Sequence, residues 1–333
     1  MGTSLTRDIT VIIRSSGERT EAVCRKLLAE QAEADCIEMV QEAPFYQALR
    51  QTLIRGRAAG RTWTLAVDAD LLVRTGALAE MAAFAQLQAP EVLFVSGWCM
   101  DKLLCCCRPA GLHLYRTSLI DDKLLKILAG VEASIRPERD LVIAAERVLN
   151  RKAVVMPPDP LCLHDHEQYY ADVYRKAFVH ARKHSDEIDM LIAAWRALGD
   201  TDLDFKIALL GARASRSWPE EVRMDVRSLP REVMPLLNMM GTTEKPPLEA
   251  DALSGREISE LIQRLHQEGS IPMMDRHSGY AQGGSVLTRW QEIRRSLGFT
   301  RSVQWVIGCR LKKWGLHMMR RAQSAGKNCA PVL

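Results

Sequence analysis

Residues 63–70 read WTLAVDAD, an apolar and β-branched run that leads directly into two carboxylates, Asp68 and Asp70. A run of this composition is typical of a strand buried in a sheet. Ligands of open α/β sheets collect at the carboxyl ends of the strands, so we expect both carboxylates to face the crevice in which a ligand binds. Carboxylate oxygens suit Mg²⁺ or Mn²⁺, which take one or two protein carboxylates and complete their shell with phosphates and water. The stretch therefore predicts a divalent-cation site at a strand end.

Two aspartates separated by one residue also occur further along the chain, at Asp200 with Asp202 and at Asp202 with Asp204. Neither pair follows a strand, so we interpret them as a solvated turn and a helix cap. For Asp68 and Asp70 the alternative to a cation site is an ordinary turn at the end of the strand. The apolar run before them favours the cation site.

Short apolar or β-branched runs alternate with helical periodicity through the first half of the chain. Strands that alternate with helices indicate an α/β domain with a mostly parallel sheet and helices on both faces. We expect strands at 9–13, 36–40, 63–67, 92–95, 112–115 and 153–156, and helices at about 18–34, 48–59 and 141–149.

The second half of the chain has a different periodicity. Apolar residues at helical spacing predict helices from about 170 to 184 and from about 186 to 198. Stretches rich in Gly, Pro and polar residues at 242–255 and 269–285 indicate loops or linkers. The 333 residues therefore divide into an α/β ligand-binding domain at 1–165, a helical region at 166–240, linker and loops at 241–285, and a basic amphipathic region at 286–333.

The composition excludes several classes of protein. With 47% hydrophobic and 26% charged residues the chain is of ordinary globular type, not collagenous, low-complexity or wholly disordered. No charge-free apolar run approaches the roughly 18 residues that a membrane-spanning helix needs, and the N-terminus has no signal-peptide pattern. We therefore expect a cytoplasmic protein.

The C-terminal region has a strong excess of positive charge. Residues 286–333 hold ten Lys or Arg against a single acid, Glu292. Between 300 and 321 Trp, Ile and Leu are interleaved with basic residues, as in helices that lie at a membrane interface. We expect this segment to contact the anionic inner face of the membrane, with a solvated or core-packing helix as the alternative. We do not expect nucleic acid as a partner.

Several motifs, taken in chain order, resemble one known family. They are ITVIIRS (9–15), WTLAVDAD (63–70), PAGLHLYR (109–116), PERDL (137–141), AVVM (153–156) and LH (163–164). Their order and spacing resemble the nucleotide-sugar half of GT-A fold glycosyltransferases, most closely the large inverting family 2. The resemblance covers about residues 8–170, roughly half of the chain.

The resemblance implies a Rossmann-like GT-A catalytic domain at 1–165, with an acceptor-side region after it. It implies transfer of a sugar, of the hexosyl type, from a nucleotide-diphosphate sugar to a hydroxyl of a carbohydrate or glycolipid acceptor, as in surface polysaccharide or glycolipid synthesis. Mn²⁺ or Mg²⁺ would neutralise the charge that develops on the leaving diphosphate. Asp70 would bind this cation directly, Asp68 would be shared between cation and ribose, and His164 would be the third ligand.

A carboxylate on the opposite side of the sugar must take the proton of the attacking hydroxyl. The family carries an adjacent Glu-Asp pair at this point, whereas Arg139 separates Glu138 from Asp140 here. We prefer Asp140 as the base, because it directly precedes the apolar helical run, and keep Glu138 as the first alternative.

The donor nucleotide would bind where the first strand gives way to a turn and a helix N-terminus, because unpaired backbone amides there favour anions. Plain helix capping is the alternative role for these residues. After the second strand, where the family has an aspartate-rich turn for base and ribose, this chain offers only Glu42. The candidate donor-binding residues are Arg14, Ser15, Glu18, Arg19, Glu42 and Asp68.

Two other functions are compatible with the sequence. A nucleotidyltransferase also places metal-binding aspartates at strand ends, but no Gly-rich, Lys-containing phosphate loop follows the first strand here. A non-catalytic, glycosyltransferase-like binding module would fit the missing aspartate-rich turn.

Overall fold

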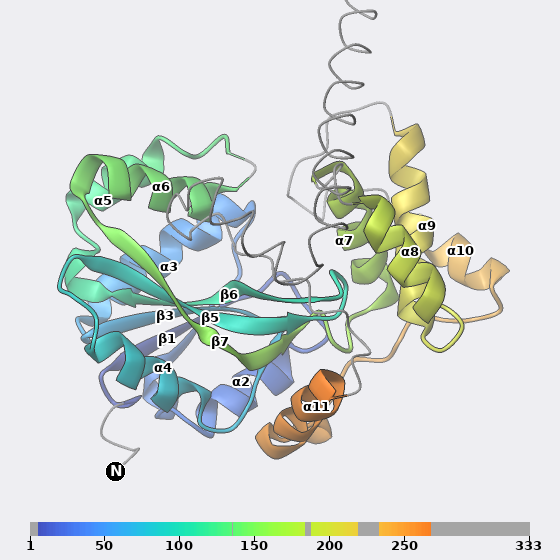
Figure 1. Ribbon diagram of the computed structural model, residues 1–333, viewed down its shortest axis with the longest axis horizontal. Helices are drawn as coiled ribbons and strands as arrows, with labels where there is room; N and C mark the ends of the chain where they lie inside the picture. Colours follow the sequence, from blue (N-terminus) through green and yellow to red (C-terminus); the bar gives the residue numbers. More distant parts are fainter. Residues whose placement is uncertain (1–5, 135, 184–187, 219–232, 268–333) are drawn as a thin grey trace, which may run out of the picture. The chain divides into compact units, whose positions relative to one another are not determined.

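The strand that ends at Asp68 belongs to a seven-stranded sheet (Figure 1). The computed structural model describes residues 6–134, 136–183, 188–218 and 233–267. The strand order is β2-β1-β3-β6-β5-β7-β4. The strands are β1 (Ile9–Arg14), β2 (Ile37–Val40), β3 (Trp63–Asp68), β4 (Leu71–Val73), β5 (Val92–Asp101), β6 (Cys106–Arg116) and β7 (Lys152–His164).

The sheet is mixed, which corrects the prediction of a mostly parallel sheet. β1 is parallel to β2 and β3, and β5 is parallel to β7, whereas β6 is antiparallel to β3 and β5 and β4 is antiparallel to β7. The reason is local: only residues 102–105 separate β5 from β6, enough for a hairpin but not for the crossover that a parallel pair requires. The α/β class itself is confirmed.

Helices cover both faces of the sheet, as predicted (Figure 1). Helices α2 and α4 pack on one face, and α3, α5 and α6 pack on the other. Successive residues of β3 serve the two faces, because side chains alternate along a strand: Leu65 joins the first apolar cluster and Ala66 the second. The helices are α2 (Glu21–Ala29), α3 (Phe45–Ala59), α4 (Ala77–Gln86), α5 (Asp122–Ala129), α6 (Pro137–Leu149), α7 (Tyr170–Lys183), α8 (Ile188–Leu198), α9 (Leu203–Ser217), α10 (Val233–Met239) and α11 (Gly255–Gln267).

The helices after the sheet include a closely packed pair, α7 and α9. A Cβ on Gly211 of α9 would lie 2.2 Å from the backbone oxygen of Tyr174 on α7, so only glycine permits this approach. Asp202 caps α9 as predicted, since its side chain accepts a hydrogen bond from the amide of Asp204 (2.9 Å). Asp204 is not solvated as we expected but buried, because its carboxylate pairs with Lys102 at 2.5 Å.

Residues 242–254, here named the connecting segment, link α10 to α11 and contact several earlier elements. The carboxylate of Glu244 accepts hydrogen bonds from the amides of Tyr170 and Ala171 (2.7 and 2.9 Å) and so caps the N-terminus of α7. Two residues later, the carbonyl of Pro246 accepts a hydrogen bond from Arg19 Nε at 2.7 Å. The segment therefore ties α7 to the turn between β1 and α2.

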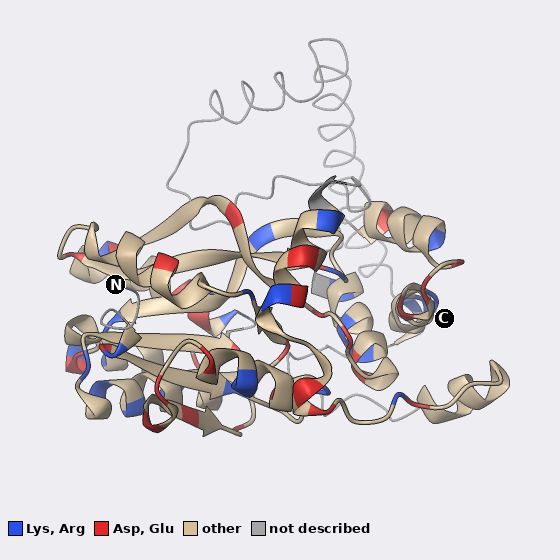
Figure 2. Ribbon diagram, turned by 90° about the horizontal axis from the view of Figure 1, so that it is seen from below, with Lys and Arg blue, Asp and Glu red and all other residues tan. Residues whose placement is uncertain are grey.

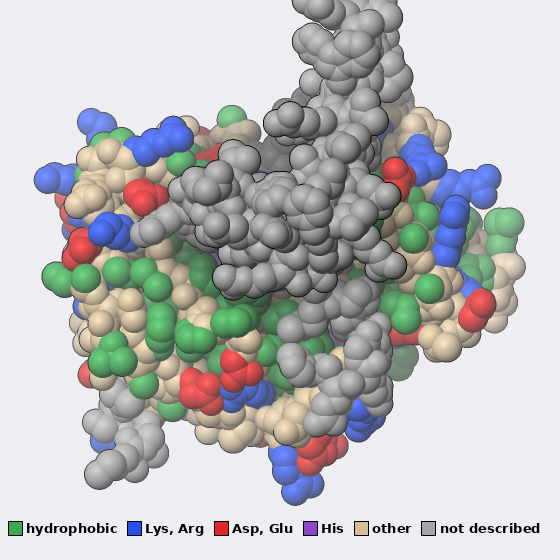
Figure 3. All heavy atoms as spheres, in the orientation of Figure 1, with side chains coloured by type: hydrophobic (Ala, Val, Ile, Leu, Met, Phe, Trp, Pro, Cys, Tyr) green, Lys and Arg blue, Asp and Glu red, His purple; other side chains and the backbone are tan. Residues whose placement is uncertain are grey.

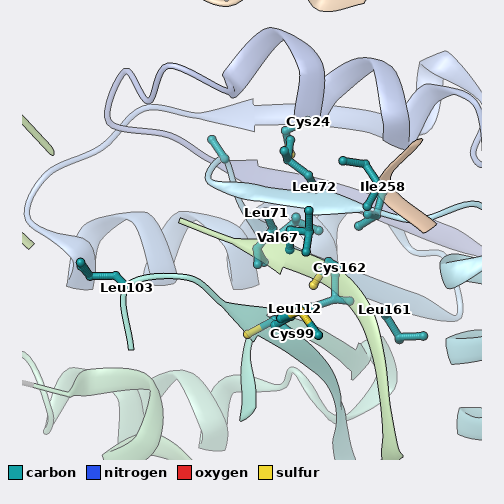
Figure 4. Close-up of a cluster of buried hydrophobic side chains, with 14 of the residues drawn as sticks. Cys24, Val67, Leu71, Leu72, Cys99, Leu103, Leu112, Leu161, Cys162 and Ile258 are labelled. Carbon is teal, nitrogen blue, oxygen red and sulfur yellow. The ribbon is translucent and has the colours of Figure 1, made fainter. Parts of the chain in front are cut away.

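Helix α11 occupies part of the region for which we predicted linker and loops. Its residues Ile258 and Ile262 are buried, and Ile258 shares the main apolar cluster with Leu72 and Leu161 (Figure 4). The flanking Gly- and Pro-rich stretches hid this short apolar pattern in the sequence.

Charged side chains of both signs are interspersed over the described helices and strands (Figures 2 and 3). No helix in the described part of the chain has the length and apolar character needed to cross a membrane. The basic segment 300–321 lies outside the described residues, so its contact with an anionic membrane surface stays a prediction.

Candidate functional site

The carboxyl ends of β1, β3, β5 and β7 lie at one edge of the sheet. The register places Arg14 beside Asp68 on the neighbouring strands β1 and β3. It also places Asp101 of β5 beside His164 of β7. Strand β4 pairs with β7 at this same position and begins one residue after Asp70. Residues distant in the sequence are thereby gathered at one place.

Arg14 joins two acidic residues named in the sequence analysis. Its Nε donates to Asp68 Oδ1 at 2.7 Å, and its Nη1 donates to Glu138 Oε1 at 3.0 Å. The hydroxyl of Tyr115 donates to the same Glu138 oxygen at 2.7 Å. Burial raises the pKa of Asp68 to about 6 against the opposing effect of Arg14. Burial also raises the pKa of Glu138, but Arg14, His113 and the hydrogen bonds outweigh it and lower that pKa to about 2, so Glu138 is ionised at neutral pH.

Asp140, our preferred base, does not join this group. Residues two apart on a helix project in nearly opposite directions, about 200° from one another. Glu138 is buried beside Arg14, whereas Asp140 is half-buried and accepts a hydrogen bond from the hydroxyl of Ser134 at 2.5 Å. Asp140 also lines a surface hollow with other residues of α6. The structure therefore brings Glu138, and not Asp140, to Asp68.

His164 is held on one side by a carboxylate and faces another on the opposite side. Its Nδ1–H donates to Asp101 Oδ2 at 2.9 Å, and its Nε2 lies 3.5 Å from Asp70 Oδ1. Asp101 is held in turn by Arg108 Nε at 2.7 Å. Burial lowers the pKa of His164, but Asp165, Asp70 and Asp101 outweigh it and raise that pKa to about 9. Without a bound cation the ring is therefore protonated at neutral pH.

Asp70, His164 and Asp165 fit the requirements of a divalent cation. Each offers one ligand atom, and these atoms all lie within 4.8 Å of one another. Asp70 Oδ1 and Asp165 Oδ2 are buried and have no hydrogen-bond partner among the residues that the structure describes. A metal-bound histidine usually donates its other N–H to a carboxylate, as His164 does to Asp101. The mixed nitrogen and oxygen ligand set suits Mn²⁺ better than Mg²⁺, which prefers oxygen.

Asp68 lies outside this group, although it was predicted as a shared ligand, because Arg14 binds its Oδ1. Its Oδ2 faces Gly111, which has a φ of +66°. A Cβ at Gly111 would lie 3.1 Å from Asp68 Oδ2 and 2.8 Å from Leu71 Cδ1, so the position requires glycine. The PAGLHLYR stretch thus approaches the site closely at its glycine.

Sequence reasoning missed Asp165 and Lys176. The Lys176 ammonium donates to both Asp70 and Asp165 from the middle of α7. Asp165 adopts a φ of +58°, a left-handed conformation that non-glycine residues rarely take and that often marks functional sites. One signal was available: Lys176 follows Val173 by one helical turn, at the border of the apolar stripe of its helix.

The predicted donor residues after β1 lie together. The hydroxyl of Ser15 is within hydrogen-bond reach of Glu18 and Glu21, and Glu18 also accepts from the amide and hydroxyl of Ser16 (2.8 and 2.6 Å). Helix α2 begins only at Glu21, and no side chain caps it. These contacts organise the turn and do not extend the helix.

The side chain of Arg19 points away from this turn, and Glu42 lies after another strand, β2. Arg19 Nη1 donates to the carbonyl and the carboxylate of Glu167, at 2.9 and 2.8 Å, in the loop after β7. Glu42 is exposed in the turn after β2. Arg19 therefore supports the loop that carries Asp165, and Glu42 remains available on the surface.

Comparison with known proteins gives several structural matches, and two of them are glycosyltransferases. No family model matches the sequence, and no curated protein sequence matches it. The structure matches that of a glycosyltransferase involved in glycosylation of the major capsid of PBCV-1, with 17% identity over 47% of this chain and 93% of that chain and a TM-score of 0.32. It also matches the mannosyltransferase PcManGT from Pyrobaculum calidifontis in complex with GDP-Man and Mn²⁺, with 17% identity over 70% of this chain and 79% of that chain and a TM-score of 0.32. Values this low transfer no activity to this chain.

Proposed function

We propose that this chain is a metal-dependent, inverting glycosyltransferase that moves a sugar from a nucleotide-diphosphate sugar to an acceptor hydroxyl. The observation that carries the proposal is the convergence, at one sheet edge, of a cation-binding group with the ion pair of Arg14 and Asp68. The carboxyl edge of an open α/β sheet is where nucleotides bind, and a cation beside it can reach their phosphates.

The chain's own residues would position the donor. Asp70, His164 and Asp165 would bind a cation that neutralises charge on the leaving diphosphate. Asp101 fixes the orientation of the His164 ring through the Nδ1–H bond. Asp68 keeps one oxygen turned toward Gly111, where it can accept a hydrogen bond from a ribose hydroxyl. Of the two cations expected from the sequence, Mn²⁺ accepts an imidazole ligand more readily than Mg²⁺.

Glu138 is the residue that we assign as the base, in place of Asp140. Arg14 and Tyr115 both bind its Oε1, and its Oε2 lies 3.5 Å from His113 Nε2. These contacts fix the carboxylate, and Oε2 is the oxygen that would take the proton of the acceptor hydroxyl. A base on the acceptor side of the sugar, opposite the leaving diphosphate, gives inversion at the reacting carbon. The assignment is supported by the approach of Glu138 to Asp68 through their shared partner Arg14.

The acceptor is proposed from the sequence alone. A carbohydrate or glycolipid in surface-glycan synthesis follows from the family resemblance and from the basic 286–333 region, which would hold the protein at the inner face of the membrane. The helical region after β7 would face this acceptor.

A thermal-shift screen of nucleoside diphosphates, with and without Mn²⁺, tests the proposal. A ligand that binds only the folded state raises its apparent stability, so we expect one nucleoside diphosphate to raise Tm only when Mn²⁺ is present. Hydrolysis of the matching nucleotide sugar would then establish turnover. Release of pyrophosphate from a nucleoside triphosphate would indicate a nucleotidyltransferase instead, and binding without any turnover would indicate a binding module.

A further inference from the structure

The ammonium of Lys176 contacts two of the carboxylates that we propose as ligands of a divalent cation. It bridges Asp70 Oδ2 and Asp165 Oδ1, and the three side chains are 18%, 9% and 2% exposed. Lysine is rarely buried to this degree unless it is paired. Here both partners are carboxylates of the proposed cation site.

Each of these carboxylates divides its two oxygens in the same way. One oxygen of each goes to Lys176. The other lies near a ring nitrogen of His164: Asp70 Oδ1 is 3.5 Å from Nε2, and Asp165 Oδ2 is 3.3 Å from Nδ1. The oxygens that face His164 have no hydrogen-bond partner within the described ranges. A cation that binds them would lie beside the Lys176 ammonium and repel it, because the site is buried and water screens the two charges poorly.

The Lys176 side chain is flexible and borders a cavity about the size of one water molecule, which is lined also by Lys102, Val173 and Phe205. Four methylene groups give the ammonium a reach of several ångströms from its backbone on α7. An ammonium displaced from two carboxylates needs another anion, and the donor's diphosphate is the anion that the proposed reaction brings to this edge.

We propose that Lys176 is a tethered cation of the donor site: it occupies Asp70 and Asp165 until a divalent cation displaces it, and it then pairs with the diphosphate of the donor. This inference rests on the proposed function, since it takes the same cation and the same diphosphate. Lys176 would make metal binding weak in the absence of donor and stronger in its presence. The donor would thereby help to load its own metal.

Binding of Mn²⁺ alone, followed by the electron paramagnetic resonance signal of free Mn²⁺, tests the first half. We expect Lys176→Met to bind Mn²⁺ on the order of tenfold more tightly than the unaltered chain, because a competing positive charge is gone. Lys176→Arg keeps the charge and should not gain affinity. Arg175→Met is the matched control, because Arg175 is the neighbouring cation on α7 and pairs with Asp172 instead of Asp70. Should Lys176→Met fail to fold, Lys176→Gln serves the same purpose.

Binding of inorganic pyrophosphate at saturating Mn²⁺, measured by calorimetry, tests the second half. We expect Lys176→Met, which binds Mn²⁺ more tightly than the unaltered chain, to bind pyrophosphate about tenfold more weakly, because it lacks the charge that pairs with the diphosphate. Equal pyrophosphate affinity would overturn the pairing with the diphosphate.

The outcomes separate this inference from the proposed function. Equal Mn²⁺ affinity in the unaltered chain and Lys176→Met would overturn the competition while leaving a metal-binding enzyme. Absence of Mn²⁺ binding in both would overturn the metal-dependent function and this inference together. Mn²⁺ binding by Lys176→Met and not by the unaltered chain would support the proposal, because Lys176 would then exclude the cation when no donor is present.

Discussion

Arg14 and Asp68 are paired in both backbone and side chain. Their Cα atoms are partners in the register of β1 and β3, and Arg14 Nε lies 2.7 Å from Asp68 Oδ1. Arg14 is almost fully buried and also holds Glu138. One guanidinium therefore compensates the buried Glu138 and the half-buried Asp68, which reach the site from different elements.

Replacing Arg14 by Met should destabilise the fold strongly. Removal of one partner from a buried pair leaves an uncompensated charge and typically costs about 3 to 5 kcal/mol. Urea unfolding monitored by circular dichroism measures the change. Arg7→Met is the control, because Arg7 pairs with Glu33 where both side chains are exposed, and exposed pairs contribute little. Equal losses in the two variants would contradict the importance of burial.

The identity of the base can be decided by two conservative substitutions. Glu138→Gln should lower kcat by roughly 10² to 10⁴, the usual contribution of a positioned base, with little change in donor affinity. Asp140→Asn should change kcat by less than about threefold, because it lies outside the Arg14 group. Steady-state kinetics on the nucleotide sugar identified in the screen gives both values. If the two variants exchange these results, Asp140 is the base and our reassignment is wrong.

Asp70→Asn should abolish the Mn²⁺-dependent rise in Tm caused by the nucleoside diphosphate. Amide substitution removes a charged ligand while keeping the side-chain size, so the fold should survive. Addition of a chelator to the unaltered protein should have the same effect on nucleotide binding. Asp200→Asn is the control, because Asp200 is 94% exposed and distant in sequence from the site. An intact Mn²⁺ requirement in Asp70→Asn would remove the central claim.

Gly111→Ala should disturb the donor site more than an equally strained glycine elsewhere. Gly111 and Gly60 have φ values of +66° and +68°, so alanine at either position carries a similar backbone penalty of about 1 kcal/mol. A Cβ at Gly60 meets no atom within 4 Å in the described structure, whereas at Gly111 it meets Leu71 and Asp68. We expect both variants to lose stability and only Gly111→Ala to lose nucleotide binding. Thermal shift with and without ligand compares them.

Asp121 provides a pH-dependent contribution to stability away from the site. It accepts a hydrogen bond from the amide of Leu124 at the start of α5 and two from Arg151, which lower its pKa from 3.8 to about 2. A carboxyl group whose pKa is lower in the folded than in the unfolded chain stabilises the fold at pH values above its unfolded pKa. This contribution is lost as the pH falls through its folded pKa.

Asp121→Ala should therefore lose about 1 kcal/mol at neutral pH, the typical contribution of a capping residue, and the difference should shrink between about pH 4 and pH 2. Urea titrations at several pH values measure it. Asp122→Ala is the control, since that side chain is 89% exposed. A difference that grows toward low pH would contradict the assigned direction.

The sequence predicted the α/β class and the position of most strands because buried strands carry continuous apolar runs. It also singled out Asp70 and His164, which the structure brings together. Strand direction was harder, since it depends on the hairpin between β5 and β6 and not on the composition of either strand. The turn of Asp165 and the insertion of Lys176 depend on tertiary packing of α7, which periodicity alone does not specify.

The contacts of the connecting segment affect how this protein can be shortened. Glu244 caps α7, the helix that delivers Lys176, and Pro246 receives Arg19 from the turn after β1. Beyond them, Ile258 fills the core against the first half of the chain. The boundary at residue 165 suggested by sequence motifs therefore does not mark a separable piece, and a fragment ending there would lose the Asp165 partner on α7 together with part of its core. A shortened chain that keeps these contacts has to extend to Gln267, the end of α11.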